Sequence, residues 1–308
     1  MSSVLYDTPG PKAKVRNVIY TVVFLVVLAL AGWWVVATMA DKNQLEADKW
    51  TPFLEGDVWT TFLLPGLGET IKAGALAMVI ALPLGALLGI GRLSDHAWVR
   101  VPVGAVVEFF RAIPVLILMV FGSALFVQFT DIESEIRPLY ACVTGLVLYN
   151  ASVIAEIVRA GIHSLPKGQG EAAKALGLRK SQTMAYVLVP QAVTAMLPAL
   201  VSQLVVILKD TALAGAVLGY GELLSMNRQI SANYSNTIPT LIVIGLLYVL
   251  LNFVLTGFAS WLEQRMRRSK KSTNGTRANT MVAGPTGGEG TLAAVPAQGN
   301  GTESATSS

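Results

Sequence analysis

The chain has 308 residues, of which 53% are hydrophobic and 14% charged, with a formal net charge of +4. Soluble domains are about 25% charged, so the composition excludes an ordinary soluble protein and indicates a membrane protein. Lys and Arg residues cluster beside apolar runs, which membrane topology explains and which argues against nucleic-acid binding. The single cysteine, Cys142, has no partner for a disulfide or a thiol metal site, so we interpret it as a packing residue.

Six apolar runs are each long enough to cross a hydrocarbon core of about 30 Å as an α-helix. They predict an all-α membrane protein with six transmembrane helices. The predicted spans are 18–40, 68–91, 102–129, 138–161, 186–208 and 237–262. The first run is longer than the apolar region of a secretory signal, which has about 7 to 15 residues. We therefore expect it to remain as an uncleaved span.

Basic residues beside the spans predict their orientation. Lys12, Lys14 and Arg16 precede the first span and place residues 1–17 in the cytoplasm, and an even number of spans returns the C-terminus to the same side. Both termini are therefore expected to be cytoplasmic. Residues 265–308 are rich in Gly, Thr, Ser, Ala and Asn, and they are expected to form a disordered cytoplasmic tail.

The loop between the fourth and fifth spans, residues 164–190, is the most informative segment. It reads SLPKGQGEAAKALGLRKSQTMAYVLVP. Glu171 to Leu176 predicts a short helix of strong helix formers that stops at Gly177. Ala172 and Ala173 give this helix a surface of small residues that a partner can approach closely. By themselves, these three residues fit a solvated amphipathic elbow as well.

The whole loop resembles the signature of the binding-protein-dependent ABC importer permeases. That signature is EAA, three residues, Gly, nine residues, an aliphatic residue, one residue, an aliphatic residue and Pro. This chain has, in that register, Glu171, Ala172, Ala173, Gly177, Val187, Val189 and Pro190. Three further stretches resemble the polar amino-acid branch of the family, which serves histidine, glutamate, glutamine and arginine: VEFFRAIPVL from Val107, AEIVRAGIHSLPKGQGEAA from Ala155 and LKDTALA from Leu208.

The resemblance implies a five-helix type I importer core at 66–264, with an additional N-terminal helix at 18–40, in the bacterial cytoplasmic membrane. Two permeases would pair as a homodimer or with a sister subunit. The residues that would couple them to a separate ATP-binding ABC subunit are Glu171, Ala172, Ala173 and Gly177. ATP and Mg would be bound by that ATPase, so this chain would not be an enzyme. An extracytoplasmic solute-binding protein would deliver a polar amino acid, with glutamate favoured by a general likeness to glutamate permeases.

Charged residues also lie within or at the edges of the predicted spans. A charge at the bilayer centre costs about 2.5 to 3.5 kcal/mol on insertion scales, so such side chains should face protein or water. Glu108 with Arg111, and Glu156 with Arg159, have i, i+3 spacing and share a helical face. Each pair is interpreted either as mutual neutralisation or as part of a substrate pathway.

Lys209 and Asp210 are adjacent in the sequence and cannot face each other on a helix. Each therefore needs another partner, which is a different helix, water or substrate, and both are candidates for the substrate pathway. An amino-acid zwitterion would present both signs of charge to such a site.

The alternative function is an ion-coupled secondary amino-acid transporter. Such a protein would show internal repeats and interrupted helices around a midplane site, and the sequence shows no convincing repeat. The sequence also has no G-x-x-x-x-G-K-[ST] phosphate loop, so the energy for transport would come from another subunit.

Overall fold

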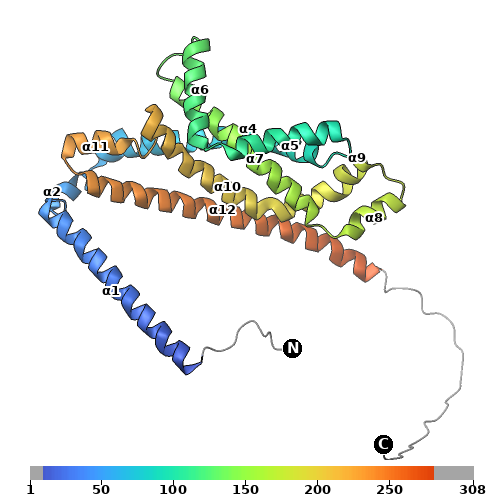
Figure 1. Ribbon diagram of the computed structural model, residues 1–308, viewed down its shortest axis with the longest axis horizontal. Coiled ribbons are helices and arrows are strands. Elements are labelled where there is room, and N and C mark those ends of the chain that lie inside the picture. Colours follow the sequence, from blue (N-terminus) through green and yellow to red (C-terminus); the bar gives the residue numbers. More distant parts are fainter. Residues whose placement is uncertain (1–9, 281–308) are drawn as a thin grey trace, which may run out of the picture. The chain divides into compact units, whose positions relative to one another are not determined.

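The computed structural model describes residues 10–280, and every regular element in that range is a helix (Figure 1). Contacts divide the chain into two units, residues 1–264 and 265–308. The long apolar helices are α1 (Pro11–Asp41), α4 (Leu64–Arg92), α7 (Arg137–His163), α10 (Val189–Leu218) and α12 (Thr237–Thr280). Within residues 10–280, five segments are long and apolar enough to cross a membrane, and a sixth is added if one bent helix pair counts as a span. The predicted all-α membrane fold is confirmed.

The third predicted span, 102–129, is not one helix. It is a pair, α5 (Ala97–Ala112) and α6 (Val115–Phe129), bent by 99°. Pro114 causes the break, because it has no N–H to donate and because its ring disfavours the helical conformation at the preceding residue. Ile113 accordingly has extended angles, with φ −92° and ψ 129°. The prediction of one continuous helix was therefore wrong at this position.

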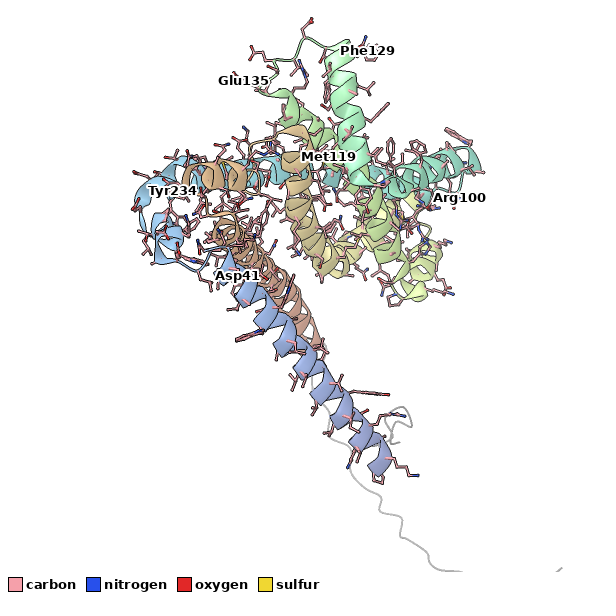
Figure 2. The ribbon with its side chains drawn as sticks, turned by 60° about the vertical axis from the view of Figure 1, so that its left-hand side comes forward. Asp41, Arg100, Met119, Phe129, Glu135 and Tyr234 are labelled. Atoms are coloured by element: carbon pink, nitrogen blue, oxygen red, sulfur yellow. The ribbon has the colours of Figure 1, made fainter. Side chains whose placement is uncertain are left out.

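Helix α6 is anchored at its base and exposed at its far end (Figure 2). Met119 is fully buried, and its backbone nitrogen lies 2.7 Å from the position that a Cβ on Gly145 of α7 would occupy. Phe129, at the other end, is exposed and leads into the loop that contains Glu135. The glycine thus allows the base of α6 to lie directly against α7.

Two other boundaries differ from the prediction. Helix α10 continues past residue 208 to Leu218, which places Lys209 and Asp210 inside a helix. Residues 265–280 are helical although disorder was predicted, because the Arg, Met and Lys residues that begin this segment are good helix formers and extend an existing helix. The predicted disorder of 281–308 and the predicted cytoplasmic position of residues 1–9 lie outside the described residues.

Shorter helices fill the remaining connections. Between α1 and α4 lie α2 (Ala47–Trp50), η1 (Thr51–Leu54), α3 (Gly56–Val58) and the π-helix η2 (Trp59–Leu63). Between α7 and α10 lie α8 (Lys167–Ala175), α9 (Lys180–Gln182) and the π-helix η3 (Thr183–Leu188). Helix α11 (Met226–Tyr234) precedes α12.

Helix α7 is the centre of the bundle, where it packs against α4, α5, α6 and α10. Its closest neighbour is α4, because Gly85 and Gly89 face it. A Cβ added at Gly85 would lie 2.6 Å from Ile154 Cβ and 2.7 Å from the Ala151 carbonyl oxygen. Such small residues let membrane helices approach closely. Cys142 is fully buried in this core, which confirms its packing role.

Candidate functional site

The loop between α7 and α10 forms a short helix at the place where the sequence predicts one. Helix α8 starts at Lys167 rather than at Glu171, directly after Pro166, whose ring holds φ at −56°. Gly168 is therefore inside the helix. The predicted stop is confirmed, since Gly177 has a φ of +76°, a left-handed value that glycine adopts without steric cost.

The two alanines of the EAA sequence have different environments. Ala173 is buried, where α8 contacts η3, whereas Glu171 and Ala172 are exposed. Leu176, four residues after Ala172 and so on the same face, is 81% exposed. Helix α8 thus presents an acidic, a small and a large apolar side chain outward and is fixed to the bundle through its other side.

The segment after α8 is joined to the turn between α4 and α5. The Lys180 ammonium contacts the Asp95 carboxylate and donates a hydrogen bond to the Leu93 carbonyl oxygen at 2.6 Å. The hydrogen bond from Lys180 holds the pKa of Asp95 below its ordinary value. These residues line a cleft of about 750 Å³ together with His96 and Met184.

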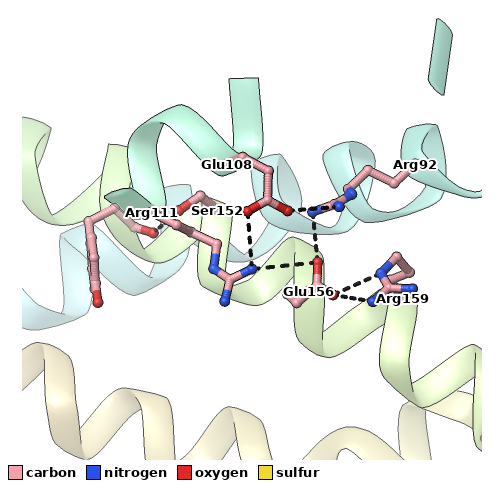
Figure 3. Close-up of polar contacts among 7 residues, drawn as sticks. Arg92, Glu108, Arg111, Ser152, Glu156 and Arg159 are labelled. Carbon is pink, nitrogen blue, oxygen red and sulfur yellow. Dashed lines mark hydrogen bonds and ion pairs between the residues drawn. The ribbon is translucent and has the colours of Figure 1, made fainter. Parts of the chain in front are cut away.

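Five charged side chains from three helices form one cluster, which Figure 3 shows. Arg92 of α4 donates to Glu156 of α7 at 2.7 Å and to Glu108 of α5 at 2.9 Å. Arg159 donates to Glu156 through Nε at 2.8 Å. Arg111 is more distant, with Nη1 3.8 Å from Glu156 and 3.9 Å from Glu108. Both predicted i, i+3 pairs are present, and Arg92 merges them.

This cluster contains three guanidinium groups and two carboxylates, so it carries one positive charge in excess. The side chain of Arg92 is 16% exposed and that of Arg111 is 39% exposed. Arg92 therefore lies at the centre of the cluster, and Arg111 lies at its more accessible edge.

Arg111 also lines a cleft of about 490 Å³ at the break between α5 and α6. Asp210 of α10 lines the same cleft, together with Pro114 and Tyr149. The structure thus brings together two candidates from different predicted spans, one cationic and one anionic. The α-ammonium and α-carboxylate groups of an amino acid are complementary to these two charges.

Lys209 lines a different cleft, also about 490 Å³, with Tyr248 and Asn252 of α12. The expectation that Lys209 and its neighbour Asp210 face different surroundings is confirmed. Among the described residues, no three His, Cys, Asp or Glu side chains are grouped closely enough to hold a metal ion.

A second polar centre lies in the connection between α10 and α11. The Glu222 carboxylate is fully buried and accepts hydrogen bonds from Leu224 N at 2.7 Å, Ser225 N at 2.7 Å and the Tyr248 hydroxyl at 2.8 Å. Its three donors come from its own connection and from α12. Together they fix this connection to the last span.

The residues beside Glu222 bind the first part of α4. The Tyr220 hydroxyl donates to Glu69 Oε2 at 2.8 Å, and Leu223 N donates to Thr70 Oγ1 at 3.0 Å. The connection between α10 and α11 is therefore joined to α4 as well as to α12.

Sequence reasoning missed the roles of Arg92 and Glu222. Arg92 stands directly after an apolar run, where a basic residue is ordinarily explained by membrane topology alone. Glu222 lies in a segment without apolar periodicity, GYGELL, so no sequence pattern marks its burial. A charged residue at the end of a span is the one signal that points to Arg92.

Several apolar spans, partly buried charges between them and a short helix outside the bundle define a multi-pass membrane transport subunit. The chain belongs to the family of binding-protein-dependent transport system inner membrane components, whose family model matches residues 81–268. It is therefore a permease subunit of an ABC amino-acid importer, as the loop signature predicts. A secondary transporter, the alternative from sequence, is a different class of protein.

Known relatives give the same picture. The glutamate transport system permease protein GluD of Corynebacterium glutamicum is 46% identical over 236 residues, which cover 77% of this chain and 86% of that protein. BztC of Rhodobacter capsulatus, a glutamate/glutamine/aspartate/asparagine transport system permease protein, is 31% identical over 64% of this chain and 46% of that protein. A crystal structure of an amino acid ABC transporter with histidines has a TM-score of 0.61 and 28% identity, covering 67% of this chain and 95% of that one.

Proposed function

We propose that this chain is the membrane subunit through which an ABC importer carries glutamate into a bacterial cell, with α8 as its contact to a separate ATPase. The geometry of α8 carries this proposal. Its outward surface of Glu171, Ala172 and Leu176 has room for a close partner, and its buried Ala173 transmits movement to the bundle through η3. The ATPase binds the ATP and Mg.

This proposal fixes the orientation of the chain. Helix α8 and both termini lie in the cytoplasm, in agreement with Lys12, Lys14 and Arg16 beside the first span. An extracytoplasmic solute-binding protein docks on the opposite side of the membrane and delivers the substrate. A second permease, a copy of this chain or a sister subunit, completes the channel.

Two observations support glutamate as the substrate. The relative at 46% identity over most of both chains is named a glutamate permease. The cleft between α5 and α10 has Arg111 and Asp210 on its wall, beside a cluster with one positive charge in excess. Such a wall offers Asp210 to the substrate ammonium and Arg111 to a carboxylate. Lys209, in its separate cleft, contributes further positive charge near the pathway.

Substitutions on α8 test the ATPase contact. Glu171→Lys reverses a charge on the outward surface of α8, and Gly177→Asp puts a side chain at a left-handed φ of +76°. In both variants we expect the permease to remain in the membrane while co-purification of the ATPase is lost and glutamate uptake falls at least about tenfold. Glu135→Lys, an exposed acidic position in a loop on the opposite side of the membrane, is the control for charge reversal and should leave co-purification of the ATPase unchanged. Normal uptake and normal co-purification in both α8 variants would refute the contact.

Competition experiments test the substrate. We expect unlabelled glutamate to inhibit the uptake of labelled glutamate by the complete importer more strongly than glutamine or arginine does. Stronger inhibition by arginine would reject an acidic substrate while leaving the ATPase contact intact.

A further inference from the structure

We propose that Arg92 is a positioning residue, which keeps the guanidinium of Arg111 available as the cation of the transport cleft. The inference rests on the proposed function, since it explains how that cleft favours an acidic amino acid. Arg92 extends from the end of α4, whereas the cleft wall is formed by residues of α5, α6, α7 and α10 and the break at Pro114. Its effect on the substrate therefore passes through another side chain.

The distances in the cluster show that Arg92 binds Glu108 and Glu156 more closely than Arg111 does. Arg92 lies within hydrogen-bonding distance of both carboxylates, at 2.7 Å from Glu156 and 2.9 Å from Glu108. Arg111 lies 3.8 and 3.9 Å from the same carboxylates, beyond the range of a good hydrogen bond. Arg159 occupies the other oxygen of Glu156. Each carboxylate is therefore already neutralised by a nearer guanidinium.

Removal of Arg92 would change this balance. Two guanidinium groups would remain for two carboxylates, and Arg111 would become the nearest cation to Glu108. A movement of about 1 Å turns its long contacts into hydrogen bonds, and the attraction grows as the distance falls. Arg111 would then be held by the cluster, and the positive charge beside Asp210 would be lost.

The chemical consequence concerns substrate charge. Glutamate carries two carboxylates and one ammonium group, so it has one more negative charge than its amide, glutamine. A cleft with an available guanidinium and one carboxylate favours the acid over the amide, and a cleft whose guanidinium is neutralised does not. Arg92 thus controls selectivity between glutamate and glutamine without lining the cleft.

The experiment measures the binding of labelled glutamate and glutamine to the purified permease–ATPase complex by equilibrium dialysis, without the solute-binding protein. We expect Arg92→Gln to weaken glutamate binding about tenfold, roughly the contribution of one charge-assisted contact, and to change glutamine binding by less than about twofold. The double variant Arg92→Gln with Glu108→Gln restores one positive charge in excess. It should recover glutamate binding to within about twofold of the wild type.

The rescue separates positioning from a purely structural role, because removing a second charged partner would not repair a damaged fold. An unchanged preference for glutamate in Arg92→Gln, or a double variant no better than the single one, overturns the inference. Should Arg92→Gln fail to assemble, Glu108→Gln alone decides: unchanged or tighter glutamate binding supports the inference, and weaker binding overturns it. A wild-type complex that binds no glutamate also overturns the inference, whereas the proposed function is decided separately by the uptake experiments on the complete importer.

Discussion

The two ends of α4 hold polar groups in different ways. Near its start, Glu69 and Thr70 bind the connection between α10 and α11, where Glu222 is fully buried and accepts three hydrogen bonds of 2.7 to 2.8 Å. At its end, Arg92 belongs to a cluster whose side chains are between 16% and 60% exposed and whose contacts reach 3.9 Å.

This difference indicates which end is built to move. A buried acceptor with every donor in place fixes one geometry, because any shift leaves polar groups unpaired in a low-dielectric interior. A partly exposed cluster with more cations than anions has alternative pairings of similar energy. We therefore expect the Glu222 end to stay fixed during transport and the Arg92 end, which is joined to the segment after α8, to rearrange.

The largest expected loss of stability comes from removing the buried carboxylate at the Glu222 end of α4. Glu222→Leu keeps a side chain of similar size but removes the acceptor of the Leu224 N–H and of the Tyr248 hydroxyl. The Ser225 N–H loses the carboxylate but keeps the backbone carbonyl oxygen of residue 222, at 3.1 Å. Each unpaired donor costs about 1–3 kcal/mol, so at least about 2 kcal/mol of stability should be lost. A thermal unfolding measurement on the purified permease checks this.

Two control variants sharpen this result. Tyr248→Phe removes one of the three donors and should cost only about 1 kcal/mol. Glu135→Leu, at an exposed loop position, should leave the unfolding temperature unchanged. A Glu222→Leu protein as stable as the Glu135→Leu control would show that the buried carboxylate does not fix this end.

An intermediate loss of stability is expected from a substitution in the middle of α4. This part of the helix must be rigid if the two ends are to behave differently. In Gly85→Ala the new Cβ meets Ile154 Cβ at 2.6 Å and the Ala151 carbonyl oxygen at 2.7 Å. Forced overpacking of this kind costs about 1–3 kcal/mol. Gly68→Ala, on the same helix with open space around it, is the matched control and should stabilise by up to about 1 kcal/mol. Equal effects of the two changes on unfolding temperature would contradict close packing of α4 on α7.

Much of this fold can be predicted from the sequence, because the length of an apolar run and the position of a small residue are properties of a single segment. The runs that became α4 and α7 are long enough to span a membrane, and the positions of Gly85 and Gly89 already indicate close helix approach. The bend after Ala112 did not follow, because proline inside a membrane span kinks the helix by an amount that its neighbours decide. The bend of 99° accompanies the packing of α6 against α7 and α10, which no local pattern specifies.

The candidate site was only partly predictable for a related reason. The i, i+3 spacing correctly placed Glu108 beside Arg111 and Glu156 beside Arg159, since that pairing is internal to a helix. The contacts of Arg92 join residues 16 and 64 positions apart. No local pattern specifies contacts between helices, so the merged cluster and the cleft shared by Arg111 and Asp210 required the structure.

The smallest expected effect on stability comes from substitutions beside the Arg92 end of α4, where Lys180 binds Asp95 and the Leu93 carbonyl oxygen. Exposed ion pairs contribute little to stability, so Lys180→Asp and Asp95→Lys should leave the unfolding temperature unchanged. Each should nevertheless reduce ATP-driven glutamate uptake a few-fold in proteoliposomes that contain the complete importer, because the turn that follows Arg92 is no longer held to the segment after α8.

The exchanged double variant, with Asp at 180 and Lys at 95, restores the ion pair but not the hydrogen bond to Leu93, since a carboxylate cannot donate to a carbonyl. Uptake should therefore recover in part. Double-variant uptake as low as that of either single variant would mean that the ion pair does not couple the two segments. A lowered unfolding temperature in the single variants would instead assign the contact to the fixed framework, and the contrast between the two ends of α4 would no longer hold.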